Sequence, residues 1–138
     1  MDRLTVEHEF DPQTGFIVAR ETVDLPPIIA DGPTLDAAVA QAGQDRLVIA
    51  FATADRCAPC QQYKRDTLND DRVLARLADE RFLPTHAEVD RQPEAATAIL
   101  GSRAIPMTYA LRDGQVVSTL RGQRSPAELL DWLQRLPG

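Results

Sequence analysis

Two cysteines, Cys57 and Cys60, are the residues of this chain whose type and spacing point most directly to chemistry. They are the only cysteines of the sequence, and only Ala58 and Pro59 separate them. Two thiols at this spacing can form a disulfide within one chain, but the loop that it closes is too short to restrict the unfolded chain much. The pair is therefore better suited to reversible thiol–disulfide exchange than to holding a fold together.

The residues on either side predict that the pair lies where a buried strand passes into a helix. The apolar run 47–52 has the length and continuous hydrophobicity of a central strand, and residues 61–65 favour a helix. Free N–H groups and the helix dipole stabilise a thiolate at the start of a helix. We therefore expect Cys57 to attack as the thiolate, and Cys60 to be the shielded thiol that resolves a mixed disulfide.

Zinc binding is the other common use of this cysteine spacing. A closed tetrahedral site needs four ligands, and only His8 and His86 could supply nitrogen. These histidines lie far apart in the sequence and have no ligand-like spacing. We therefore expect neither a metal nor another cofactor.

The composition is that of one ordinary globular domain with an acidic balance. The chain has 138 residues and a net charge of −6, which argues against nucleic acid as a partner. Charges interrupt every apolar run, so no membrane segment is expected, and the first residues lack the apolar core of a secretion signal. We expect a cytoplasmic protein if the chain is complete, or a periplasmic one whose signal peptide has been removed.

The chain from residue 34 onward predicts an α/β domain. Helices are expected at 34–41, 61–65, 70–77, 93–100 and 126–136, and strands at 47–52, 82–90, 107–111 and 115–120. Thr34 and Ser125 stand at N-cap positions, and Asp113-Gly114 predicts a tight hairpin turn. Helices between the first strands imply parallel pairing, followed by a closing antiparallel hairpin.

Residues 1–33 form a separate amino-terminal extension. Runs 4–10 and 16–23 favour strands and flank a segment rich in turn formers, which predicts a β-hairpin; a loose arm is the alternative. The pairs Pro26-Pro27 and Gly32-Pro33 then predict a linker to the domain at 34–138.

Several short motifs occur in a characteristic order along this domain. They are Cys-Ala-Pro-Cys at 57–60, Val-Asp-Arg-Gln-Pro at 89–93, Ala-Ile-Pro at 104–106, Arg-Asp-Gly at 112–114, and Gly122. In this order the chain resembles the thioredoxin family over residues 34–137. Residues 67–73 look most like the carboxy-terminal thioredoxin domain of the bacterial disulfide reductase DsbD.

The resemblance implies a thioredoxin-like fold, in which a central mixed sheet is flanked by helices. It also implies a cis peptide bond between Ile105 and Pro106, packed against the disulfide. In the family, the backbone of the residue before this proline pairs with an extended substrate segment, and here that residue is Ile105.

Two departures from the family concern the surroundings of the cysteines. Arg56 stands where thioredoxins usually have tryptophan. Its guanidinium could stabilise the Cys57 thiolate and favour acidic partner surfaces, or it could simply point into solvent. The buried acid that the family commonly places six residues before the first cysteine is replaced by Phe51, and Lys64 stands where DsbD-like domains often have an acid.

The missing acid leaves the proton of the resolving thiol without its usual acceptor. His86 has a reference pKa near 6.5 and could transfer a proton at neutral pH, and Glu88 on the same strand face is a second candidate. The alternative for His86 is a hydrogen-bonded strand residue without a part in the chemistry.

The family resemblance and the cysteine pair together predict a thiol–disulfide oxidoreductase, and specifically an enzyme that reduces protein disulfides. Its partners would be protein disulfides and an upstream thiol reductant, its role bacterial redox homeostasis, and we expect a monomer. The alternative is a redox-sensing or partner-binding module with the same fold and little turnover.

Overall fold

The computed structural model describes residues 8–10, 17–19 and 22–137. The protein is built around a four-stranded mixed sheet. The strands lie in the order β4-β3-β5-β6, with bounds β3 Leu47–Thr53, β4 Phe82–Glu88, β5 Met107–Arg112 and β6 Gln115–Arg121. β3 pairs in parallel with β4 and antiparallel with β5, while β5 and β6 form an antiparallel hairpin. The predicted mixed sheet is confirmed.

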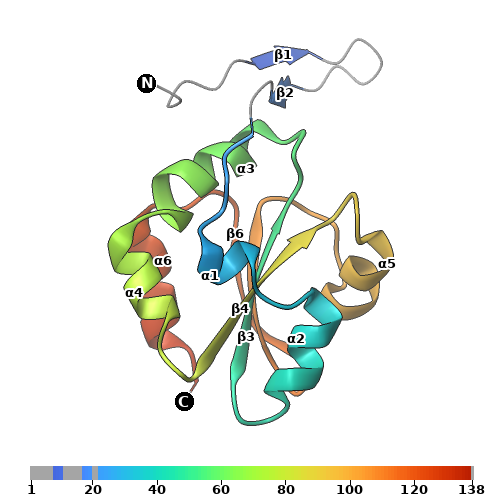
Figure 1. Cartoon of the computed structure of the whole chain (residues 1–138). Helices are drawn as coiled ribbons and strands as arrows, with labels where there is room; N and C mark the ends of the chain where they lie inside the picture. The colour runs from blue at the N-terminus through green and yellow to red at the C-terminus, as the bar shows by residue number, and fades with distance from the viewer. Residues whose placement is uncertain (1–7, 11–16, 20–21, 138) are drawn as a thin grey trace.

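Helices cover both faces of this sheet (Figure 1). On one side lie α3 (Ala58–Tyr63) with its π-helical continuation η1 (Lys64–Leu68), α4 (Asp71–Leu77) and α6 (Pro126–Arg135). On the other lie α2 (Leu35–Ala42) and α5 (Pro93–Ala95) with its π-helical continuation η2 (Ala96–Leu100). Because both faces are covered, all residues of β3 are buried, which explains its unbroken apolar sequence.

The sheet separates two apolar cores, because successive residues of a strand point to opposite faces. Phe51 belongs to the core beneath α3, α4 and α6, whereas its neighbour Ala52 belongs to the core beneath α2 and α5. Any polar side chain that shares the face of Phe51 therefore points towards the helix that begins at the cysteines.

Local hydrogen bonds explain where most elements begin and end. The Ser125 hydroxyl accepts the Glu128 N–H at 3.2 Å, and the Glu128 carboxylate accepts the Ser125 N–H at 2.9 Å, which completes the predicted capping box. Asp113 and Gly114 take φ values of 54° and 77°, as the tight turn between β5 and β6 requires. Thr34 precedes α2, but its hydroxyl donates to Asp36 and makes no capping bond to the helix backbone.

The segment assigned to a linker from the sequence contains a short helix, α1 (Pro27–Ala30), which the sequence analysis missed. Its Ile29 side chain is 1% exposed and packs into the core on the α3 side. Gly32 then passes so close to the edge strand β4 that an added Cβ would lie 2.9 Å from the Pro84 carbonyl oxygen. This stretch is packed against the domain and is no free connection.

The amino-terminal extension also contains the two strands β1 (His8–Phe10) and β2 (Ile17–Ala19), which pair antiparallel. The predicted turn between them lies outside the described residues. β2 contacts α3, so the extension approaches the helix that carries the second cysteine (Figure 1).

Candidate redox site

A disulfide joins Cys57 and Cys60 at the point where β3 passes into α3. The two Cα atoms lie 5.2 Å apart. Cys57 is the N-cap residue of α3, and its sulfur accepts the Cys60 N–H at 3.2 Å. Pro59 lies in the first turn, where its missing N–H has no intrahelical partner to lose. The predicted strand–disulfide–helix arrangement is confirmed.

The two cysteines differ in their access to solvent. Cys57 is half-buried, whereas Cys60 is 0% exposed. A protein disulfide can therefore approach the Cys57 sulfur, while the Cys60 sulfur is shielded inside the domain. This asymmetry has the direction expected for an attacking and a resolving cysteine.

The loop before β5 lies against the same core as Cys57. The peptide bond between Ile105 and Pro106 is cis. Pro106 is buried, and its carbonyl oxygen accepts the Gly122 N–H at 3.0 Å. Ile105 and Cys57 are both partly buried and pack against the core on the α2 side.

Arg56 is paired with an acid. Its Nε and Nη2 lie 2.8 and 3.2 Å from the two carboxylate oxygens of Asp90, which follows β4. The guanidinium holds the pKa of Asp90 below its usual range. The positive charge beside Cys57 is thus largely compensated, and Arg56 links the loop before α3 to the loop before α5.

Glu88, at the end of β4, also binds the loop before α3 and the loop before α5. Its side chain is buried, and its carboxylate accepts the backbone N–H of Asp55 at 2.9 Å, of Asp90 at 2.8 Å and of Arg91 at 3.0 Å. Three main-chain donors therefore occupy this carboxylate. The arrangement makes Glu88 a support of the cysteine loop, and its part in proton transfer stays a prediction.

His86 lies on β4 directly opposite Phe51 of β3. Its Nε2 lies 2.6 Å from the hydroxyl oxygen of Thr53. Burial lowers the pKa of His86 to about 4, and the nearby positive charges of Lys64 and Arg91 act in the same direction. His86 is therefore a neutral, weakly basic imidazole at neutral pH, which argues against it as acceptor of a thiol proton; that role stays a prediction.

The sequence model of the thioredoxin-like domain matches residues 34–137. The chain belongs to this family. Its fold and the Cys57–Cys60 disulfide together support a thiol–disulfide oxidoreductase.

Solved thioredoxins share the fold of this thioredoxin-like protein. A thioredoxin from Thermus thermophilus is 28% identical, with a TM-score of 0.63 over 74% of this chain and 82% of the other. A thioredoxin h mutant from poplar is 20% identical, with a TM-score of 0.62 over 87% of this chain and 95% of the other. No curated protein sequence matches the chain significantly. The particular likeness to the DsbD domain stays a prediction.

Two buried polar residues near the cysteines were not recognised as site residues from the sequence. Gln61 is 0% exposed, donates to the Asp55 carbonyl at 3.1 Å and accepts the Val23 N–H at 2.6 Å. Lys64 is also buried, and its Nζ lies 3.8 Å from an Asp55 carboxylate oxygen. Burial lowers the pKa of Lys64, although the nearby acids Asp55 and Glu88 oppose this effect. The helical spacing of Lys64 from Cys60 was the available clue to its position.

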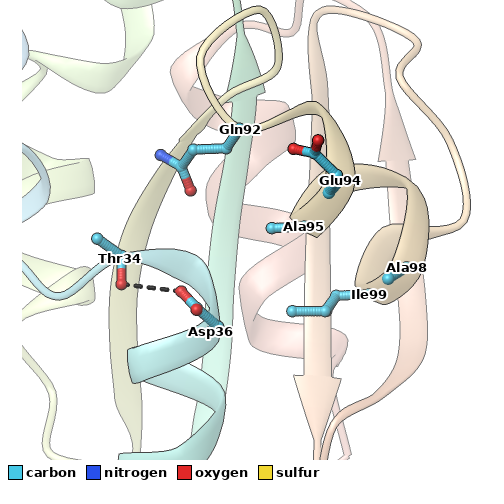
Figure 2. Close-up of a pocket in the computed structure, with 7 residues that line it drawn as sticks. All are labelled: Thr34, Asp36, Gln92, Glu94, Ala95, Ala98 and Ile99. Carbon is cyan, nitrogen blue, oxygen red and sulfur yellow. Dashed lines mark hydrogen bonds between the residues drawn. The ribbon is translucent and has the colours of Figure 1, made fainter.

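A shallow groove of about 640 Å³ lies away from the disulfide, between the start of α2 and the segment α5–η2 (Figure 2). Asp36 and Glu94 stand on its two walls, and Ala95, Ala98 and Ile99 form its apolar side. Neither cysteine lines this groove, and none of its residues was predicted from the sequence as a site residue.

Neither a metal site nor a membrane-spanning helix occurs among the described residues. No group of three or more histidine, cysteine, aspartate or glutamate side chains there is arranged to hold a metal ion. No helix in this part of the chain is long and apolar enough to cross a membrane.

Proposed function

We propose that this protein reduces disulfides of other proteins through the Cys57–Cys60 dithiol. The observation that carries this proposal is the half-buried Cys57 sulfur at the start of α3, hydrogen-bonded by the Cys60 N–H and backed by a fully buried Cys60. A hydrogen bond to sulfur favours its charged form, and the thiolate is the form that attacks a disulfide.

The reaction proceeds in two exchanges. The Cys57 thiolate attacks one sulfur of the substrate disulfide; that bond breaks, a Cys57–substrate disulfide forms, and the other substrate sulfur leaves as a thiolate and takes up a proton. The Cys60 thiol then loses its proton and attacks the Cys57 sulfur, which releases the second substrate thiol. The protein gives up two electrons and two protons and ends as the disulfide seen in the structure.

Substrate is held, in this proposal, along the backbone of Ile105 before the buried Pro106. An extended segment of the partner pairs with this backbone as an added strand would, which places its disulfide over Cys57. Arg56 and Asp90 flank the same approach as a compensated pair, so we expect them to contribute hydrogen bonds to the partner more than net charge.

In this proposal electrons flow from the protein to its substrates. Proline within the Cys57–Cys60 motif resembles reducing members of the family, for which the thioredoxin potential of about −270 mV is the reference. A thiol reductant upstream would then return the protein to its dithiol form. We expect a potential below about −230 mV in glutathione buffers, whereas a value above about −180 mV would indicate an oxidant or isomerase.

Insulin reduction in the presence of dithiothreitol tests the proposal. We expect catalysed turnover by the wild type, no turnover by Cys57→Ser, and a trapped mixed disulfide with substrate in Cys60→Ser. Turnover that survives Cys57→Ser would overturn the assignment of the nucleophile. Absence of turnover in the wild type would favour the sensing or partner-binding module, for which the contact of β2 with α3 offers a route of communication.

A further inference from the structure

Lys64 is a buried charged group that the reaction above does not use. Its side chain is 4% exposed, although lysine is rarely buried without a close partner. Among the described residues, its Nζ forms one ion pair, with Asp55 at 3.8 Å, which is beyond hydrogen-bond length. Asp55 also binds Arg91, so its carboxylate is shared between two cations. The ammonium of Lys64 is therefore only partly compensated.

The position of Lys64 relates it to Cys60. Its backbone N–H donates to the carbonyl oxygens of Cys60 and Gln61, so Lys64 stands one helical turn after Cys60. Residues four apart lie on the same face of a helix, and long side chains lean towards its amino end. The Lys64 side chain follows this direction, because its Nζ reaches Asp55 in the loop before the cysteines. The Lys64 side chain thus lies along the buried side of the first turn of α3, where Cys60 also lies.

Several titratable groups from other elements lie close enough to interact electrostatically with the ammonium of Lys64. They are Asp55 before α3, Glu88 and His86 on β4, Arg91 after β4, and Asp24 in the segment before α1. Glu88 already accepts three backbone N–H groups, and His86 is neutral at neutral pH. Lys64 is consequently the cation with the deepest position in this cluster, since Arg91 is 70% exposed.

We propose that the Lys64 ammonium stabilises the thiolate that Cys60 must form in order to resolve the mixed disulfide. This inference rests on the proposed function: where the family commonly has a buried acid that accepts the proton, this protein has a fixed cation that stabilises the thiolate once the proton has left. A thiolate inside the domain is costly, because burial disfavours the charged form. A cation within one helical turn offsets that cost, and the proton of Cys60 then passes to water or to the departing substrate thiolate.

The size of the effect follows from Coulomb's law. At about 6 Å, the general spacing of residues four apart on a helix, and an effective dielectric constant of about 20, one unit charge stabilises a thiolate by enough to change a pKa by one unit or more. A one-unit rise in the pKa of Cys60 would cut its thiolate fraction about tenfold at neutral pH. Higher intrinsic nucleophilicity recovers part of that loss, so resolution should slow by about threefold to fourfold.

The direct test is to titrate Cys60 alone. In Cys57→Ala, Cys60 is the single cysteine of the chain, and the ultraviolet absorbance of its thiolate can be followed against pH. Adding Lys64→Met, which keeps most of the length of the side chain and removes its charge, should raise the measured pKa by about one unit. Lys64→Gln should act in the same direction. Arg76→Met is the matched control, because it removes one positive charge from an exposed position on α4.

The outcomes separate this inference from the proposed function. A rise in both Lys64 variants but not in the Arg76 variant supports the inference, and so does slower release of substrate from the mixed disulfide in otherwise wild-type protein. A pKa that moves no further than in the Arg76 control overturns it, even if insulin is reduced normally. Conversely, a wild type without insulin turnover would leave the titration valid, since no substrate takes part in it.

Discussion

At the scale of single residues, the ionisable groups beneath the cysteines differ from those common in the family. Phe51 supplies a hydrophobic ring where the family commonly has an acid, and its cross-strand partners are the polar residues His86 on β4 and Thr108 on β5. Thr53 and Glu88 follow two residues further along the same face. Glu88 is held by backbone donors, and His86 is neutral. The charge closest to the resolving cysteine along the helix is positive, on Lys64, so proton release from Cys60 must follow a route without the usual acid.

The lowered pKa of His86 predicts a pH dependence of folding stability. The folded state has a pKa of about 4 for His86, against 6.5 in the unfolded chain, so between these values the unfolded state binds more protons. The stability should therefore be complete above about pH 6.5 and fall as the pH drops towards about 4. At about 1.4 kcal/mol per unit, the loss is of the order of 3 kcal/mol.

Urea unfolding of the oxidised protein across this range measures the effect, since the cysteines do not titrate in the disulfide. His86→Gln should make the free energy of unfolding depend less on pH in this range, because glutamine does not titrate. The same substitution should leave the pH profile of dithiol oxidation near neutrality unchanged. A profile that shifts with His86→Gln would restore this residue as a proton acceptor.

The sequence predicted the cysteine pair because their types and their spacing carry the chemistry. Ile105 and Pro106 were found only through the family motif, since an Ile-Pro pair by itself indicates nothing about a disulfide far away in the chain. The burial of Lys64 could not be foreseen, because a lysine in a helix usually reaches solvent. The Arg56–Asp90 pair likewise joins residues 34 positions apart, which no local pattern reveals.

At the scale of elements, the site depends on two loops that Glu88 holds together. Its carboxylate accepts N–H groups from the loop before α3 and from the loop before α5. Glu88→Gln replaces one acceptor oxygen with an NH₂ group that faces backbone donors, so buried N–H groups lose their partner. We expect a loss of about 2–4 kcal/mol in the free energy of unfolding.

Chemical unfolding of the oxidised protein checks this loss, with Glu80→Gln as the matched control at an exposed position. The reduction potential should shift in Glu88→Gln as well, because the Asp55 N–H lies two residues before Cys57. Equal stabilities of the two variants would contradict the role of Glu88 as a support of the cysteine loop.

The elements themselves were largely predictable where periodicity or end signals were strong. The unbroken apolar run predicted β3, and the capping box predicted the start of α6. The helix α1 was missed because two prolines and four helical residues carry no periodic pattern, while the tertiary packing of Ile29 that helps to hold it cannot be read from the sequence. The π-helical turns η1 and η2 were also not foreseen, since they differ from α-helix by a hydrogen-bond shift that side-chain spacing barely records.

At the scale of the whole molecule, the family match begins at residue 34, but the packed structure begins earlier. The Val23 N–H binds the Gln61 side chain beside Cys60, and the Asn69 side chain donates to the Asp24 carbonyl oxygen at 3.0 Å. Residues 23 and 24 thus lie against α3 and the end of η1. They belong to the same packed unit as the disulfide.

Substitution of Ile29 measures how much the residues before 34 contribute to the stability of the domain. The Ile29 side chain is 1% exposed within the core beneath α3, α4 and α6, so Ile29→Ala should cost about 2–4 kcal/mol of unfolding free energy. Its neighbour Ile28 is only partly buried and provides the matched control, for which a smaller loss is expected in urea unfolding. Deleting residues 1–33 removes Ile29 and both hydrogen bonds to α3 and η1, and should destabilise the protein at least as much as Ile29→Ala. A truncated chain as stable as the full one would mean that residue 34 is a true domain boundary, and that the preceding segment rests on the redox domain without supporting it.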